Sequence, residues 1–321
     1  MKRKIISQLS AWKDNAYRKP LIVQGARQVG KTYTVLEFGR AHYDNVAYFN
    51  FETSPALQAA FEDDISPAAL VPKLQRYAGQ TVTKGKTLIV FDEVQLCERA
   101  LTSLKYFDEL GGGYHVIALG SLLGVAVNRR AFSFPVGKVD MLTMMPMDFE
   151  EFLWAWGEQP LIDKIRRCFD TNEPMDGFLH DALLTYYRKY LVTGGMPDCV
   201  AKYIGTKDTV LLQHTQAMIL ASYLNDMSKY NKENEIKKTR LVYDTIDVQL
   251  SKKNTRFRYK LIKSGGRASE FENALEWLAL SGIISKVYRV EQIAKPLENY
   301  RDVDAFKIYL SDTGLLCAKK G

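Results

Sequence analysis

Short runs of apolar, β-branched residues alternate with longer helical stretches along the first part of the chain. The runs occupy residues 21–24, 46–51, 88–91, 116–119 and 139–144. Runs of this length, separated by stretches with helical spacing, are typical of buried parallel strands joined by crossover helices. The pattern therefore predicts an α/β domain built on a parallel sheet.

The pattern changes after residue 146, where helical spacing replaces the short runs. Helices are predicted over 176–190, 207–228 and 232–250. Gly194-Gly195-Met196-Pro197 interrupts them as one sharp turn. Two interpretations of this turn stay open, because it could pack the helices together or move with the ligand state of the domain that precedes it.

The last part of the chain mixes helix and strand signals. Ser269-Glu270-Phe271-Glu272 fits a capping box that opens a helix over 271–280. Extended runs follow at 283–290 and 305–310. A helix that leads into a two-stranded ribbon is typical of a winged helix, so we predict a winged-helix region from residue 251 to 321.

Charge is unevenly placed on this chain, whose formal net charge is +7. Seven basic residues and no acidic residue fall within 251–268, interleaved with Phe257 and Tyr259. Such a stretch favours contact with the phosphates of double-stranded DNA, and its alternative is an ordinary solvated surface. The candidate nucleic-acid contacts are Lys252, Lys253, Arg256, Arg258, Lys260, Lys263 and Arg267.

Cysteine and histidine spacing gives no indication of a metal or disulfide site. The cysteines at 97, 168, 199 and 317 are too far apart for a Cys-x-x-Cys pair, and the four histidines lack metal-ligand spacing. No segment reaches the roughly 18 apolar residues of a membrane span, and no apolar core follows the basic N-terminus. We expect a soluble, cytoplasmic protein with no membrane contact.

Gly25-Ala26-Arg27-Gln28-Val29-Gly30-Lys31-Thr32 matches G-x-x-x-x-G-K-[ST] directly after the first predicted strand. In this phosphate-binding loop, or P-loop, glycines let successive backbone N–H groups and a helix N-terminus face the phosphates. Lys31 is expected to neutralise the β- and γ-phosphate oxygens, and the Thr32 hydroxyl to coordinate Mg²⁺. The residues expected to line the nucleotide are Gly25, Ala26, Arg27, Gln28, Val29, Gly30, Lys31 and Thr32.

A second motif ends the third predicted strand, where Asp92 and Glu93 follow an apolar run. Asp92 is expected to hold Mg²⁺ together with Thr32, and Glu93 to orient or deprotonate the attacking water. Ser121, after the fourth strand, could reach the γ-phosphate or be a simple turn serine. The catalytic candidates are therefore Glu93, Lys31 and Ser121. The alternative is that the glycines form an ordinary tight turn and that the acidic pair is an exposed strand end, and the presence of both motifs in the expected order argues against it.

With these residues in place, the chain resembles the prokaryotic AAA-type ATPases that carry a poorly characterised C-terminal domain. That group is distantly similar to origin-recognition and archaeal helix-loader ATPases. The resemblance runs along the whole chain and rests on the P-loop and five further segments. They are Phe91-Asp92-Glu93-Val94-Gln95, Gly120-Ser121, Pro146-Met147-Asp148-Phe149-Glu150-Glu151-Phe152, Gly194-Gly195-Met196-Pro197 and Tyr309-Leu310-Ser311-Asp312-Thr313-Gly314-Leu315-Leu316.

The resemblance implies an AAA-type P-loop ATPase domain over 1–145, a helical lid over 146–250 and the winged-helix region over 251–321. It also implies ATP as the nucleotide and Ser121 as a polar sensor of the γ-phosphate. Lys138 stands where the family usually has arginine, and lysine lacks the planar fork of a phosphate clamp. Arg129 and Arg130 are the other candidates for contact with a phosphate across a subunit interface. Their alternative interpretation is a solvated pair.

Family members usually continue into a nuclease-like C-terminal domain, whereas this chain ends at Gly321. The chain is either truncated or a member without that domain, so we expect no nuclease activity. The functional hypothesis is Mg²⁺-dependent ATP hydrolysis coupled to DNA. Its alternative is a slow nucleotide-dependent switch or scaffold, read by a protein partner or by self-association. A small-molecule kinase is weaker, because Glu93 and Ser121 suit water activation.

Overall fold

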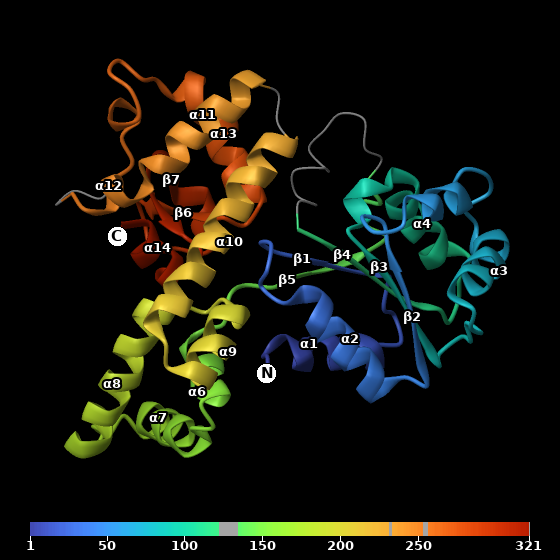
Figure 1. The fold of residues 1–321 in the computed structure, drawn as a ribbon, viewed down its shortest axis with the longest axis horizontal. Helices are drawn as coiled ribbons and strands as arrows, with labels where there is room; N and C mark the ends of the chain where they lie inside the picture. Colours follow the sequence, from blue (N-terminus) through green and yellow to red (C-terminus); the bar gives the residue numbers. More distant parts are fainter. Residues whose placement is uncertain (122–133, 231–232, 253–255, 321) are drawn as a thin grey trace. The chain divides into compact units, whose positions relative to one another are not determined.

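A computed structural model describes residues 1–321 except 122–133, 231–232, 253–255 and 321 (Figure 1). The candidates Arg129, Arg130 and Lys253 lie outside the described residues. Contacts within the chain divide it into two compact units, Lys2–Met144 and Met145–Gly321, with Met1 grouped with the second. Each unit is described by itself. No helix among the described residues is long and apolar enough to cross a membrane.

The first unit is built on a five-stranded sheet with the order β2-β3-β4-β1-β5, in which every neighbouring pair is parallel. Each strand lies within one residue of an apolar run identified in the sequence, so the predicted parallel sheet is confirmed. The strands are β1 (Leu21–Gln24), β2 (Asn45–Asn50), β3 (Thr87–Asp92), β4 (His115–Gly120) and β5 (Asp140–Thr143).

Helices cover both faces of this sheet because successive strand residues point to opposite sides. Phe49 and Phe91 face a core formed with helices α3 (Pro67–Ala78) and α4 (Glu98–Glu109). On the opposite face, α2 (Lys31–His42) brings Gly39 so close to the side chains of Val46 and Leu88 that a Cβ at Gly39 would lie 2.6 Å from Val46 Cγ2. Helix α1 (Ile5–Asp14) packs beside α2. The sheet is thus the middle layer of three (Figure 1).

The second unit begins with helices, and near its end an antiparallel hairpin, β6 (Ile284–Val290) and β7 (Arg301–Leu310), precedes a last helix. The predicted helices 176–190 and 207–228 are confirmed as α8 and α10. The helices in chain order are α6 (Phe149–Ala155), α7 (Gln159–Thr171), α8 (Gly177–Thr193), α9 (Pro197–Thr206), α10 (Thr209–Tyr230), α11 (Glu233–Asp244), α12 (Ile246–Leu250), α13 (Ala268–Leu280) and α14 (Thr313–Lys320).

Two local predictions in this unit are wrong. The continuous helix expected over 232–250 divides at Thr245, whose hydroxyl and N–H both donate to the carbonyl of Val242 and so compete with the regular helical pattern. Ser269 does not cap a helix, because α13 begins at Ala268 with Arg267 at its N-cap. A turn closed by Gly266 N–H and Lys263 O ends just before, so the chain enters the helix earlier.

The structure instead has a capping box at the start of α6, inside one of the segments that carried the family resemblance. Asp148 Oδ1 accepts from Glu151 N–H at 2.9 Å, and Glu151 Oε2 accepts from Asp148 N–H at 3.2 Å. This reciprocal pair satisfies two N–H groups that the first helical turn would otherwise leave without a partner. The segment therefore starts a helix, and capping of that helix accounts for the presence of both Asp148 and Glu151.

The turn at Gly194-Gly195 is locked against the segment that follows β7. Asp312, which is buried, accepts from Gly195 N–H at 2.5 Å and from Leu315 N–H at 2.8 Å. A Cβ at Gly194 would lie 2.1 Å from Asp312 Oδ1, and one at Gly195 would lie 1.9 Å from Met147 O. The interpretation of this turn as a packing element is confirmed, and its movement with nucleotide state stays a prediction.

Candidate nucleotide-binding site

The P-loop joins the end of β1 to the start of α2, where the sequence placed it. Gly25 has a φ of +146° and Gly30 a φ of +91°, which lies in the left-handed region. A Cβ at Gly25 would lie 2.1 Å from the carbonyl oxygen of Met144. Both glycines are therefore required by the backbone, which turns tightly and enters α2 with its first N–H groups turned to the loop.

Lys31 is buried and folded over the P-loop. Its Nζ donates to the carbonyl oxygens of Gly25 and Ala26, each at 2.9 Å. Arg3, also buried, supports the loop from the N-terminal segment by donating from Nη1 to Val29 O at 2.8 Å. An ammonium held among loop carbonyls is positioned for phosphate oxygens that approach the same loop.

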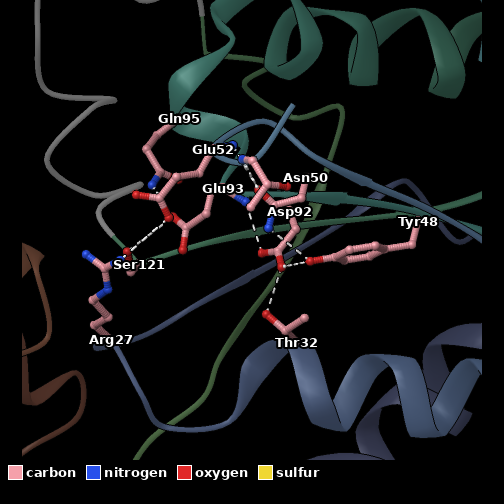
Figure 2. A network of polar contacts seen from close by, with 10 residues as sticks. Arg27, Thr32, Tyr48, Asn50, Glu52, Asp92, Glu93, Gln95 and Ser121 are labelled. Atoms are coloured by element: carbon pink, nitrogen blue, oxygen red, sulfur yellow. Dashed lines mark hydrogen bonds and ion pairs between the residues drawn. The ribbon is translucent and has the colours of Figure 1, made fainter. Parts of the chain in front are cut away.

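Thr32 and Asp92 meet at the carboxyl end of the sheet, as Figure 2 shows. The Thr32 hydroxyl donates to Asp92 Oδ2 at 2.8 Å, and Glu93 N–H donates to Asp92 Oδ1 at 2.9 Å. A hydroxyl and a carboxylate are hard oxygen donors of the kind that Mg²⁺ prefers. These two residues thus fit a magnesium site that keeps most of its water and phosphate ligands.

Tyr48, at β2, is a third residue of this cluster that the sequence analysis did not identify. Its hydroxyl donates to the same Asp92 Oδ2 at 2.7 Å, and Asn50 Nδ2 donates to the Tyr48 oxygen at 3.0 Å. Desolvation by burial raises the pKa of Tyr48 to about 12, so its hydroxyl keeps the proton that it donates. Nothing in the local sequence signals this role, which depends on the register of β2 against β3.

Glu93 follows Asp92 in a left-handed conformation, with a φ of +52° that is uncommon for a residue other than glycine. Its Oε2 accepts from Gln95 Nε2 at 2.5 Å and from the Ser121 hydroxyl at 3.4 Å. Burial raises the pKa of Glu93, and the hydrogen bond from Gln95 opposes that rise. Strained backbone at this point is consistent with a side chain that is positioned for a function.

The loop after β2 contacts the P-loop through Glu52 and lies next to the Tyr48–Asp92 contact through Asn50. Glu52 lies 3.6 Å from Arg27 of the P-loop, and its N–H donates to Asn50 Oδ1 at 2.8 Å. Figure 2 shows Arg27 beside Ser121 and Glu93. The structure therefore brings the predicted residues Arg27, Thr32, Asp92, Glu93 and Ser121 together at one end of the sheet.

Other sequence candidates are not part of this cluster. Lys138 forms ion pairs with Asp108 and Glu109 of its own unit, at 3.6 and 3.1 Å. The basic residues of 251–268 belong to the second unit, and their described members are exposed. In the described part of the chain, no group of three or more His, Cys, Asp or Glu side chains could hold a metal ion.

Comparison with known proteins agrees with this geometry. Residues 17–153 match the family model described as an AAA domain, and residues 184–321 match one described as a domain of unknown function. A Walker-type ATPase of Pyrococcus abyssi is similar in structure, with a TM-score of 0.58 and 14% identity over 100% of this chain and 96% of that chain. No curated protein matches the sequence.

Two further solved structures give lower TM-scores. The ORC2 protein of Aeropyrum pernix, in ADPNP and ADP complexes, has a TM-score of 0.43 at 12% identity over 99% of this chain and 93% of that chain. RuvB of Thermotoga maritima has a TM-score of 0.41 at 12% identity over 89% of this chain and 90% of that chain. The two family matches and the P-loop fold agree on the class: residues 17–153 are an AAA-type P-loop ATPase domain, and a domain of unknown function follows at residues 184–321.

Proposed function

We propose that this protein hydrolyses ATP in a Mg²⁺-dependent reaction at the end of β1 and β3. The observation that carries the proposal is the 2.8 Å hydrogen bond between Thr32 and Asp92, which joins the P-loop to the acid-bearing strand. Such a pair is the expected arrangement for holding Mg²⁺ against nucleotide phosphates. The choice of ATP rests on the family rather than on a base-reading contact.

Substrate binding is assigned to the P-loop. Backbone N–H groups over 25–32 and the Lys31 ammonium bind phosphate oxygens, which replace the loop carbonyls as the partners of Lys31. Thr32 and Asp92 hold Mg²⁺, which when bound neutralises charge on the phosphates. These contacts position the terminal phosphate near Glu93 and Ser121.

Glu93 is assigned to the attacking water and Ser121 to the terminal phosphate. Gln95 and Ser121 both donate to Glu93 Oε2, so Oε1 is the oxygen that we assign to accept a proton or a hydrogen bond from water. The Ser121 hydroxyl can exchange its long, 3.4 Å contact with Glu93 for a phosphate oxygen. Glu93, after β3, and Ser121, after the neighbouring strand β4, thus act on the water and on the phosphate that it attacks.

The residue assignments are tested by measuring the Mg²⁺ requirement for turnover separately from nucleotide binding. Asp92→Asn keeps the shape of the side chain but removes its charge, so it should raise the Mg²⁺ concentration needed for turnover by at least about tenfold. Lys31→Ala should abolish nucleotide binding with and without metal. Equal Mg²⁺ requirements in wild type and Asp92→Asn would remove Asp92 from the metal site.

We also propose that ATP turnover is coupled to DNA through the second unit, in which α13, β6 and β7 follow the helix-then-ribbon order of a winged helix. This proposal keeps the division of the unit into a helical lid up to residue 250 and a winged-helix region after it. The observation that favours DNA is a hollow of about 550 Å³ on the hairpin. Among the described residues, three basic and three aromatic side chains line it, and no acidic one: Arg256, Arg289, Lys307, Tyr288, Phe306 and Tyr309.

The hairpin supports this role better than helix α13 does. The outward positions of α13 include Glu272 and Glu276, which would repel phosphates. Of the sequence candidates, Arg256 lines the hollow, whereas Lys263 does not and is paired with Glu270 at 3.3 Å. Arg289 lines the hollow and is also paired with Asp302 at 2.5 Å. Arg289 and Lys307 are additions that the sequence analysis missed, because they are brought beside Arg256 only by the folding of the hairpin.

Duplex binding and DNA-stimulated turnover test the coupling. Arg289→Glu and Lys307→Glu should each lose affinity for the duplex, and the double variant most of the affinity and the salt dependence, while Lys320→Glu on α14 is the matched control for each single charge reversal. A duplex affinity that is equal in both variants would contradict the hairpin assignment. Turnover that responds to a protein and not to DNA would instead favour the switch read by a protein partner.

A further inference from the structure

We propose that Tyr48 is a positioning residue for the magnesium site, and that its hydroxyl fixes the Asp92 carboxylate in the orientation that receives Mg²⁺. The inference rests on the proposed Mg²⁺-dependent function and extends it to a residue outside both nucleotide-binding motifs. It follows from the register of two strands and from the direction of four hydrogen bonds (Figure 2).

Strand register places Tyr48 beside Asp92. In the parallel pair β2 and β3, Tyr48 is opposite Val90 and Asn50 is opposite Asp92. Residues two apart on a strand share one face, so Tyr48, Asn50 and Asp92 all lie on the face covered by α2, from which Thr32 approaches. Tyr48 Oη and Thr32 Oγ1 consequently reach the same oxygen, Asp92 Oδ2, at 2.7 and 2.8 Å.

The direction of the Tyr48 hydrogen bond is fixed by its neighbour. Asn50 Oδ1 accepts from the N–H groups of Glu52 at 2.8 Å and Thr53 at 3.0 Å, which identifies the oxygen of the Asn50 amide. Asn50 Nδ2 can therefore only donate, and it donates to Tyr48 Oη at 3.0 Å. Since a phenol has one proton and that contact uses its oxygen as acceptor, the proton is directed to Asp92.

This chain of contacts restrains the Asp92 side chain on both oxygens. Glu93 N–H holds Oδ1 at 2.9 Å, while Tyr48 and Thr32 hold Oδ2. The terminal torsion of an aspartate is otherwise broad, whereas Mg²⁺ demands near-ideal octahedral geometry. Without the Tyr48 hydroxyl, Thr32 is the one side-chain donor left to Oδ2 among the residues that the structure describes, and Thr32 is itself a proposed metal ligand. Tyr48 thus supplies the restraint on Oδ2 that does not depend on the metal.

The loop after β2 extends the same chain of contacts to the P-loop. Glu52, whose N–H is bonded to Asn50, lies 3.6 Å from Arg27 through its carboxylate. The anchor of Tyr48 is therefore part of a series of contacts that runs from Arg27 through Glu52, Asn50 and Tyr48 to Asp92.

The test is the Mg²⁺ dependence of ADP affinity, measured with a fluorescent ADP analogue for wild type, Tyr48→Phe and Tyr17→Phe. Tyr17 is 91% exposed and serves as the matched loss of a phenol hydroxyl. Tyr48→Phe should need about tenfold more Mg²⁺ for its half-maximal effect, at the low end for an outer-shell partner. ADP affinity in EDTA should match that of the wild type, thermal unfolding should show that Tyr48→Phe is folded at the assay temperature, and Tyr17→Phe should behave as wild type throughout.

Each other result is decisive. An unchanged Mg²⁺ requirement in Tyr48→Phe would overturn the inference while leaving the proposed function in place. A loss of ADP affinity that is equally large in EDTA would also overturn it, since it would show a structural role for Tyr48. If Mg²⁺ has no effect on ADP affinity in the wild type, the proposed metal-dependent function itself fails, and the inference fails with it.

Discussion

The Thr32 hydroxyl donates to Asp92 Oδ2 at 2.8 Å across 60 residues of sequence. This contact joins the helix that starts at the P-loop to the strand that ends in the acidic pair. Each partner belongs to a separate sequence motif, and the parallel order of β1, β4 and β3 brings their ends to one edge of the sheet. The nucleotide site is therefore a product of the sheet topology as much as of its motifs.

Glu93→Gln should separate nucleotide binding from turnover. Loss of a general base costs about 10²–10⁴-fold in rate, whereas the P-loop contacts to phosphate are unaffected, so kcat should fall by at least 100-fold with ADP affinity unchanged. Steady-state phosphate release and analogue binding measure the two quantities. Glu62→Gln, an exposed carboxylate in the same unit, is the control. Turnover within twofold of wild type would remove Glu93 from the catalytic role.

Gln95→Met should lower kcat with little change in KM. Methionine is similar in length but cannot donate, so Glu93 loses the 2.5 Å contact that holds its Oε2. We expect a decrease of about tenfold in kcat, because the Glu93 carboxylate is still present but is less well positioned. Gln8→Met, at an exposed position of α1, is the matched control. An effect on KM alone would assign Gln95 to nucleotide binding instead.

Two glycines of the second unit offer a matched pair for stability. Gly195→Ala should destabilise the protein by more than about 2 kcal/mol, because its Cβ would lie 1.9 Å from Met147 O in a packed turn. Gly205→Ala should be neutral or stabilise by up to about 1 kcal/mol, since Gly205 lies within α9 and its Cβ would meet no atom within 4 Å. Urea unfolding followed by circular dichroism measures both. Equal stability of the two variants would contradict the locked turn.

The first unit should lose stability in mild acid because of His115. Burial lowers the pKa of His115 to about 4, and its Nδ1 lies 2.7 Å from the Tyr43 hydroxyl. The unfolded chain binds a proton near pH 6.5 and the folded chain only near pH 4, so stability is complete above pH 6.5 and falls as the pH is lowered toward 4.

The loss of stability attributable to His115 amounts to at most about 3.5 kcal/mol, at about 1.4 kcal/mol per pH unit. His115→Asn, which keeps an acceptor for Tyr43 and does not titrate, should show a flatter dependence of the free energy of unfolding between pH 6.5 and 4. Urea unfolding at several pH values, followed by tryptophan fluorescence, makes the comparison. A parallel pH dependence in both proteins would mean that other groups cause the acid sensitivity.

The sequence was sufficient for features that depend on local pattern. The strands follow from apolar runs, and the P-loop with Lys31 and Thr32 follows from glycine spacing next to a strand. Asp92 and Glu93 follow from an acidic pair at a strand end. In each case, backbone conformation and side-chain type are set within a few residues, so an isolated segment carries the signal.

The rest depends on contacts that no local pattern records. Tyr48 reaches Asp92 only through the register of β2 against β3, and Asp312 meets Gly195 across 117 residues. The error at Ser269 has the opposite cause, because a good local capping pattern was overridden by the turn that precedes α13. Arg289 and Lys307 join Arg256 only after the hairpin forms, so a count of basic residues in 251–268 could not find them.

The central claim is tested most directly by phosphate release from ATP, measured for the wild-type chain with Mg²⁺, the wild-type chain with EDTA, and Lys31→Ala with Mg²⁺. The account predicts turnover in the first case alone, since both the metal and the P-loop ammonium act on the phosphates. Equal phosphate release by wild type and Lys31→Ala would contradict it, as would release that persists in EDTA.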